Sequence, residues 1–215
     1  MHGILCNNSD FNSTNIKIYK MILPIYGYGE PVLRKVGEEI TSEYPNLKET
    51  IANMYDTMYH AHGVGLAAPQ VGLPIRLFIV DTEPFSDSDD VSKEEAALMK
   101  EFKKTFINAK IIKEEGDIWG FNEGCLSIPD VREDVFRHDT ITIEYFDEDF
   151  NKKTEVYYGL IARVIQHEYD HIEGILFIDH LSMLKKKLIG KKLQNIMDGK
   201  ARPDYKMKYA NKKGR

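Results

Sequence analysis

One segment restricts the fold of this 215-residue chain more than any other: residues 160–171, which read LIARVIQHEYDH. Its apolar residues recur at helical spacing. His167 and His171 therefore lie one turn apart on a common face, where two imidazoles can bind one metal ion. Glu168 lies beside the pair, within reach of the proton of a water on that metal. A solvated histidine pair on a surface helix is the alternative, but the run is too apolar to be all surface. The segment predicts a core helix that carries a metal site.

A catalytic metal of this type needs a third protein ligand and one open position for water. Downstream of the helix, Glu173, Asp179 and His180 have no compelling spacing, whereas the upstream segment 122–129 contains Cys125. A cysteine binds a metal as the thiolate. An inert buried cysteine and a cysteine nucleophile are the alternatives. One thiolate cannot easily be both a tight ligand and a free nucleophile, so we favour the ligand.

Three segments together resemble the signature motifs of the peptide deformylase family. They read GVGLAAPQ at 63–70, EGCLS at 123–127 and HEYDH at 167–171, and they follow one another in the family's order. The resemblance implies a metal-dependent amide hydrolase. Such an enzyme removes the N-formyl group from the N-terminal formylmethionine of newly synthesised proteins and releases formate. It also implies an α+β fold, in which short antiparallel β-sheets pack around a central helix that carries the H-E-x-x-H motif, with a C-terminal helix.

The resemblance also implies a cofactor and a set of site residues. The cofactor would be one Fe(II) ion per chain, with Zn(II) or Ni(II) as substitutes, although sulfur and nitrogen ligands alone do not choose between iron and zinc. Oxyanion donors would be the Gln70 side chain and the Leu126 backbone N–H, and Glu168 would pass a proton to the leaving amine. We expect the substrate to meet a larger set of residues: Gly63, Val64, Gly65, Glu123, Gly124, Leu160, Arg163 and Val164.

Four charged residues near these motifs have less obvious roles. By the resemblance, Glu123 and Arg132 would pair and stiffen the metal-binding loop. Arg163 stands where the family tends to place an apolar side chain. We expect its stem to line the methionine pocket and its guanidinium to reach solvent at the rim, with a fully outward side chain as the alternative. Asp170 either orients a ligand histidine or only solvates the helix.

Two other classes of function compete with this interpretation. One is an H-E-x-x-H zinc endopeptidase, which would need its third ligand downstream of the helix. The other is a non-catalytic binding module stabilised by a metal. This alternative is less favoured, because Glu168 would have no structural role in it.

The remaining patterns predict helices at 46–61, after Ser92 and at 184–197, and strands at 75–81, 105–112, 116–121, 140–146 and 154–158. Strands and hairpins that precede a core helix favour α+β over alternating βαβ units.

We expect a disordered extension at 1–20, a catalytic domain at 21–199 and a basic tail at 200–215 that frays after Pro203. The acidic segment 82–104 is expected to be an insertion remote from the chemistry.

The net charge of −5 conceals an uneven distribution. Residues 184–215 carry twelve basic and two acidic side chains, so this end is strongly positive and the rest is acidic. Such a tail can meet polyanions, or can simply keep the protein soluble. Because formylated nascent peptides emerge from ribosomes, the resemblance suggests ribosome contact through this basic C-terminal region. Two cysteines and the lack of a membrane-length apolar run lead us to expect a cytoplasmic protein without membrane contact. We also expect it to be a monomer.

Overall fold

A computed structural model describes residues 21–87 and 92–211 of the chain. The extension expected at 1–20 lies outside the described residues. The fold is α+β, as predicted, and combines a five-stranded antiparallel sheet with four α-helices. No helix in the described ranges is both long and apolar enough to cross a membrane.

The main sheet has the strand order β2-β3-β4-β5-β6. Its strands are β2 (Gly65–Ala67), β3 (Leu77–Asp81), β4 (Lys103–Cys125), β5 (Ile128–Phe146) and β6 (Lys152–Tyr158). The strands expected at 105–112 and 116–121 are one continuous strand, because β4 pairs with β5 across the polar residues between them. The pairing shifts register around this point, including once between Glu115 and Ile118. Such breaks in the ladder bend a strand. The hairpin expected from 140–158 is confirmed as β5 and β6.

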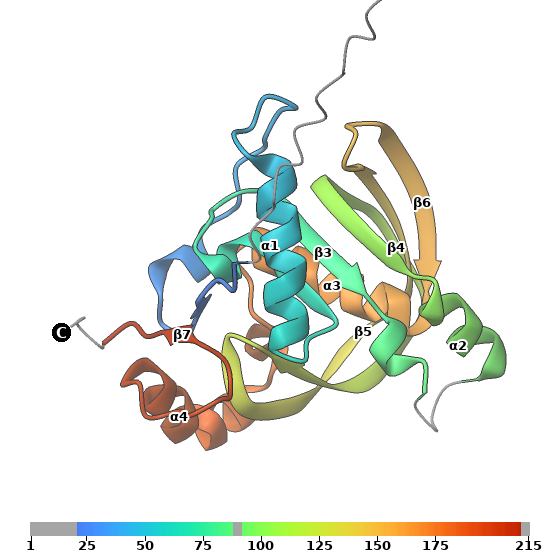
Figure 1. The fold of residues 1–215 in the computed structure, drawn as a ribbon. Coiled ribbons are helices and arrows are strands. Elements are labelled where there is room, and N and C mark those ends of the chain that lie inside the picture. Colours follow the sequence, from blue (N-terminus) through green and yellow to red (C-terminus); the bar gives the residue numbers. More distant parts are fainter. Residues whose placement is uncertain (1–20, 88–91, 212–215) are drawn as a thin grey trace, which may run out of the picture.

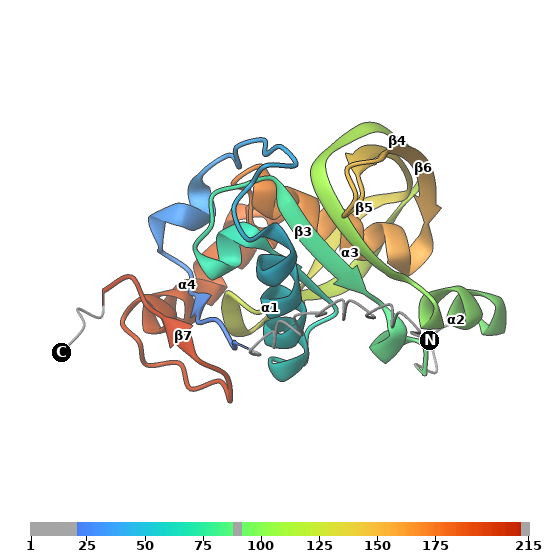
Figure 2. The same ribbon diagram turned by 45° about the horizontal axis from the view of Figure 1, so that its top comes forward.

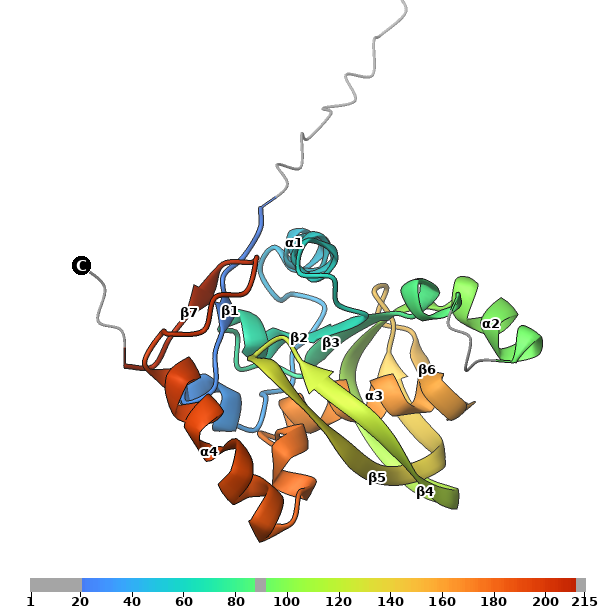
Figure 3. The ribbon, with the colours of Figure 1, turned by 90° about the horizontal axis from the view of Figure 1, so that it is seen from below.

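The predicted core helix is α3 (Gly159–Ile172), which lies against the sheet with the long β4–β5 ribbon alongside it (Figure 3). Its apolar side packs with residues of β3, β4 and β5 in the first of three hydrophobic clusters. Gly174 ends the helix region with φ of +72°. A side chain there would also meet the Arg34 carbonyl at 2.8 Å, so this position requires glycine.

The other helices surround this centre (Figure 1). Helix α1 (Leu47–His60) covers the second hydrophobic cluster, together with residues of β2 and β3. Helix α4 (Met183–Met197) packs on the third cluster, and α2 (Lys93–Lys100) lies at the other end of the molecule (Figures 1 and 2). As predicted, Ser92 caps α2 by accepting a hydrogen bond from the Glu95 backbone N–H.

The C-terminal segment is folded up to residue 211, so the frayed tail expected after Pro203 is wrong for these residues. Strand β7 (Met207–Lys208) pairs in parallel with β1 (Ile25–Tyr26), and Figure 3 shows the two strands side by side. Tyr205, Met207 and Tyr209 are partly buried and alternate with exposed lysines, the period of a strand with one covered face. Residues 205–209 therefore pack on the body of the protein.

Candidate active site

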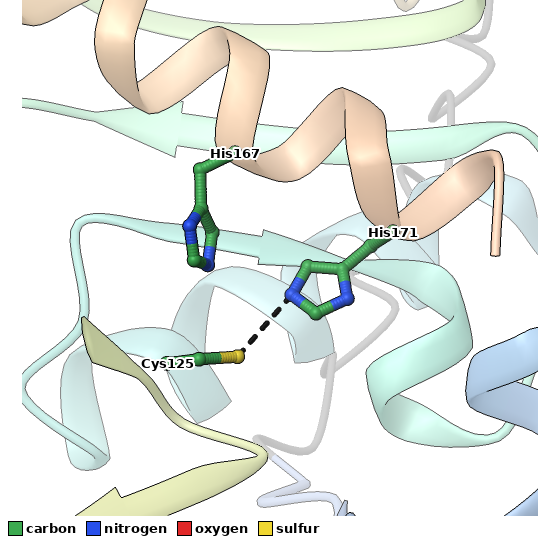
Figure 4. Close-up of side chains that lie close together, drawn as sticks. All are labelled: Cys125, His167 and His171. Carbon is green, nitrogen blue, oxygen red and sulfur yellow. Dashed lines mark hydrogen bonds between the residues drawn. The ribbon is translucent and has the colours of Figure 1, made fainter. Parts of the chain in front are cut away.

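Cys125, His167 and His171 come together as the sequence predicts. One ligand atom of each lies within 4.8 Å of the others, and the Cys125 Sγ is 3.3 Å from the His171 Nε2. Figure 4 shows both imidazoles projecting from consecutive turns of α3 toward the cysteine, which stands where β4 ends. A sulfur and two imidazole nitrogens at this separation fit one transition-metal ion.

The surroundings favour the thiolate form of Cys125. Burial alone would raise the pKa of the thiol, but the neighbouring imidazoles of His171 and His167 outweigh burial and lower it to about 5. Because the thiolate is the form that binds a metal, the cysteine is prepared for ligation at neutral pH.

His167 is oriented by Glu123, the buried glutamate at the end of β4. The imidazole Nδ1–H donates to Glu123 Oε2 at 2.9 Å. An ionised carboxylate only accepts hydrogen bonds, so the Nδ1 must carry the proton and the Nε2 is left free for a metal. Arg137 holds Glu123 in turn, through its Nε at 2.8 Å and its Nη2 at 3.1 Å.

Glu168 has a different environment although it follows His167 directly. Its side chain is buried, and its Oε2 has no hydrogen-bond partner in the described part of the chain. Burial is the main cause that raises the pKa of this carboxyl to about 7. Strand β2 approaches it closely, because a Cβ on Gly65 would lie 2.4 Å from Glu168 Oε1. This glycine therefore preserves the space for the carboxylate.

Gln70 is buried in the 3₁₀-helix η2 (Ala68–Val71) and aims its amide at the metal-binding loop. Its Oε1 accepts from the Ala67 backbone N–H at 2.8 Å, which turns the Nε2 toward the other side. There the Nε2 lies 3.5 Å from the Cys125 Sγ and 3.3 Å from the Ser127 Oγ. A neutral donor fixed beside the ligand cluster can stabilise developing negative charge on a substrate oxygen.

A cavity of about 410 Å³ opens onto these residues. Most residues expected to meet the substrate line it: Gly63, Val64, Gly65, Glu123, Gly124, Arg163 and Val164. Leu160, in the first turn of α3, does not line the cavity. It packs against the first hydrophobic cluster instead. Two aromatic residues that the sequence did not indicate, Phe85 and Phe121, complete the wall.

The segment 82–104 is therefore not remote from the chemistry, which corrects the expectation. Phe85 lines the cavity from the 3₁₀-helix η3 (Glu83–Phe85). In addition, Glu95 Oε1 of α2 accepts a hydrogen bond from the Leu160 backbone N–H at 2.9 Å. That N–H belongs to the first turn of α3, so a carboxylate from this segment caps the helix that carries the histidines.

The expected pair between Glu123 and Arg132 is wrong. Arg132 is exposed and donates to the side chain and carbonyl of Asn122, whereas Arg137 is the buried partner of Glu123. In β5, Arg137 shares its face with the buried Val131 and Val135, and Arg132 lies on the other face. This alternation was the signal in the sequence that could have identified Arg137.

The rim position expected for the Arg163 guanidinium is also wrong. Arg163 lines the cavity but is only 1% exposed. Its Nη1 donates to Glu123 Oε1 at 3.1 Å, its Nη2 donates to the Trp119 carbonyl at 2.8 Å, and the guanidinium lies over the Trp119 ring. The buried Glu123 carboxylate and two backbone carbonyls accept hydrogen bonds from the guanidinium, and these bonds hold it inside the protein and away from solvent.

The sequence left the role of Asp170 open. Within the described residues, its side chain makes no hydrogen bond to His167 or His171. It accepts from Arg137 Nη1 at 2.7 Å and from His180 Nε2 at 2.8 Å. Asp170 and Glu123 thus hold Arg137 from both sides, and this buried chain links α3 to the metal-binding loop.

Comparison with known proteins gives a consistent result. The sequence model of the polypeptide deformylase family matches residues 22–187, a range that contains all three ligand candidates. A peptide deformylase of Flavobacterium psychrophilum is 77% identical over 193 residues, which are 90% of this chain and 100% of that protein. A second, from Flavobacterium johnsoniae, is 71% identical over 91% of this chain and 100% of its own length.

Solved structures agree with the sequence comparison. The crystal structure of a peptide deformylase from Legionella pneumophila has a TM-score of 0.71 at 33% identity, covering 85% of this chain and 99% of that chain. A Plasmodium falciparum peptide deformylase in complex with an inhibitor has a TM-score of 0.67 at 32% identity, covering 80% of this chain and 97% of that chain.

Proposed function

We propose ligand and catalytic roles for the residues of this site. The chain belongs to the polypeptide deformylase family and is a metal-dependent hydrolase that removes the N-formyl group from newly synthesised proteins. We propose that Cys125, His167 and His171 hold its metal and that Glu168 is its general base. The convergence of the three ligand atoms within 4.8 Å, directly beside the buried Glu168, supports this assignment most strongly.

We propose Fe(II) as the physiological ion, one per chain, with Zn(II) or Ni(II) as substitutes. A thiolate and two imidazoles suit each of these ions. When bound, such a cation lowers the pKa of a water and so provides a nucleophile near neutral pH. Metal analysis of protein purified without oxygen, followed by activity after each ion is restored, tests the choice of iron.

In this proposal the residues around the ligands orient the formyl group and move one proton. Gly63 and Gly65 line the cavity in which the substrate binds. The Gln70 Nε2 and the Leu126 N–H donate to the oxygen of the formyl group as charge develops on it. Glu168 accepts a proton as water attacks the formyl carbon, and returns it to the departing amine nitrogen. Phe121, Val164 and the stem of Arg163 supply the apolar surface for the methionine side chain.

The ligand assignment has a direct test. Replacing Cys125 with Ala should remove bound metal and activity together, because two imidazoles alone do not retain a catalytic ion. Metal content by mass spectrometry and formate release from a formyl-Met peptide are measured on the same preparation. Near-stoichiometric metal in Cys125→Ala would place the third ligand elsewhere.

The contacts downstream of α3 do not support the alternative of an endopeptidase. Glu173 pairs with Arg76 at 2.6 Å, and His180 is bonded to Asp170, so neither is directed at the ligand cluster. Formate release from formyl-Met peptides, measured beside cleavage of an unformylated protein, separates the two activities. We expect formate release and no proteolysis, and proteolysis without formate release would contradict this expectation.

We also propose that the enzyme is a cytoplasmic monomer that contacts the ribosome through its basic C-terminal region. Helix α4 supports the contact, because Lys187 and Lys191 are exposed one turn apart beside the exposed Leu184 and Leu188. Replacing both lysines with Glu should weaken co-sedimentation with ribosomes at low salt, since phosphate contacts depend on cations. Lys48→Glu, on the exposed side of α1, is the control. Equal co-sedimentation of all variants would exclude α4 as the anchor.

A further inference from the structure

The turn that supplies the proposed oxyanion donor is held by the two ends of the described chain. Cys125 and Ile128 are paired in the β4–β5 register, so Leu126 and Ser127 form the two-residue turn of that hairpin. The carbonyls of such a turn point out of the ladder and need other donors. Here both receive one. The Tyr28 backbone N–H donates to the Ser127 carbonyl and the Tyr205 hydroxyl donates to the Leu126 carbonyl, each at 2.8 Å.

Both donors are carried by the ribbon formed by β1 and β7. Tyr28 follows β1 and Tyr205 precedes β7. The strands are joined by hydrogen bonds of 2.8 Å from the Ile25 N–H to the Lys206 carbonyl and from the Gly27 N–H to the Lys208 carbonyl. The ribbon therefore brings an N–H from one end of the fold and a hydroxyl from the other to the same two-residue turn.

The turn touches the reacting centre on its other side. Cys125 is the metal ligand immediately before it, and Gln70 donates to the Ser127 Oγ within it at 3.3 Å. Fixing the Leu126 carbonyl restricts rotation about the Leu126 Cα–C bond, and with the Cys125 end held by the ladder this limits where the Leu126 N–H can point. Oxyanion donors are effective only when their direction is set before charge develops.

We propose that the β1–β7 ribbon braces the oxyanion turn and that Tyr205 is a positioning residue for deformylation. Tyr205 acts through the Leu126 peptide and does not touch the substrate itself. Tyr205 lies beyond residues 22–187, the part of the chain that matches the family model, whereas β1 and Tyr28 lie within it. The proposal rests on the assignment of the Leu126 N–H as an oxyanion donor.

The test compares two tyrosines of the same segment in the metal-loaded, full-length enzyme. Tyr205→Phe removes only the hydroxyl that reaches Leu126. Tyr209→Phe is the matched control, because its hydroxyl donates to the Ala201 carbonyl at 3.0 Å. We expect Tyr205→Phe to lower kcat for a formyl-Met peptide about three- to ten-fold, the worth of one neutral hydrogen bond. KM, metal content and the pH dependence of kcat should stay at wild-type values, and Tyr209→Phe should keep wild-type kcat.

The outcomes separate a brace from a merely structural bond. Equal kcat in Tyr205→Phe and Tyr209→Phe, or a common loss that follows a common drop in thermal stability, overturns the brace. A rise in KM with unchanged kcat also overturns it, because that result assigns Tyr205 to substrate binding. If wild-type enzyme releases formate and Gln70→Ala impairs release while Tyr205→Phe does not, the proposed active site stands and only the brace fails.

Discussion

The end of β4 and helix α3 each place one buried glutamate beside His167, and the pKa values of the two carboxyls differ sharply. Burial would raise the pKa of Glu123 at the end of β4, but hydrogen bonds from His167 and Arg137 outweigh it and hold that pKa well below its ordinary range. Glu168 on α3 is equally buried, yet its Oε2 has no partner within the described ranges, and its pKa is raised to about 7.

The difference shows that the hydrogen-bonding partners, and not the burial alone, set the pKa of each carboxyl. A carboxylate that three cationic or imidazole donors hold ionised is suited to orient a ligand, because it cannot give up its negative charge at neutral pH. A carboxyl whose protonated and ionised forms are close in free energy near pH 7 is suited to carry a proton in both directions. The predictions below separate these roles by experiment.

The largest effect is expected at Glu168. Glu168→Gln keeps the shape but removes the proton acceptor, and general acid–base catalysis contributes roughly a hundred- to ten-thousand-fold. We therefore expect a loss of that order in kcat, with metal content near the wild-type level. Turnover of formyl-Met peptide and metal analysis on one preparation decide the matter. Metal loss in this variant would make Glu168 structural, and near-normal turnover with metal intact would remove it from the mechanism.

At Glu123 we expect the complementary result. Glu123→Gln leaves Arg163 and Arg137 without their shared anion, and breaking a buried ion pair costs about 3–5 kcal/mol of stability. Loss of the carboxylate that orients His167 should also weaken metal binding roughly ten- to a hundred-fold. Urea unfolding and metal titration measure the two losses. Turnover per bound metal should fall much less than in Glu168→Gln, and an equal fall would erase the distinction between the glutamates.

The pH profile gives a third, smaller contrast. A general base works only when ionised, so kcat/KM should be full above the pKa of Glu168 and fall about tenfold per pH unit below it. Burial sets that pKa to about 7, and a cation at the ligands lowers it. Glu123 does not titrate near pH 7, because its pKa is lowered, so it adds no further step to the pH profile of kcat/KM. Since the negative charge of Glu123 also raises the pKa of Glu168, Glu123→Gln should move the acid limb to lower pH. A shift to higher pH would contradict this coupling.

The same comparison marks what the sequence could predict. Cys125, the two histidines, Glu168 and Gln70 lie in short segments whose spacing carries the chemistry, so the sequence could predict that these side chains come together. The partners of Glu123 come from other elements, and the choice of Arg132 followed nearness along the chain, whereas the alternation of β5 buries Arg137. The inward turn of Arg163 depends on carbonyls of β4 and β5, which no helical pattern reveals.

The two outer segments were misjudged for a related reason. Composition described 82–104 as acidic and the C-terminal region as basic, and both descriptions hold. Composition did not reveal Phe85 in the cavity wall, Glu95 at the start of α3, or the ribbon that brings Tyr205 to Leu126. Each of these contacts joins residues more than fifty positions apart, or depends on a single side chain within a polar segment. Charge patterns indicate solvation, and they do not indicate such contacts.

The smallest effect is expected when one cation is removed from Glu123 and the other is kept. Arg163→Met keeps an unbranched side chain against Trp119 and the cavity, but it leaves Glu123 held by Arg137 and His167 alone. Because Glu123 still has two partners, metal affinity should fall only about two- to five-fold, far less than in Glu123→Gln. Selectivity for Met over Ala at the first position should be retained, since the apolar stem remains. Competition between formyl-Met and formyl-Ala peptides measures the selectivity, and metal titration measures the affinity. A loss as large as that of Glu123→Gln would mean that Arg163, and not Arg137, is the partner that keeps Glu123 ionised.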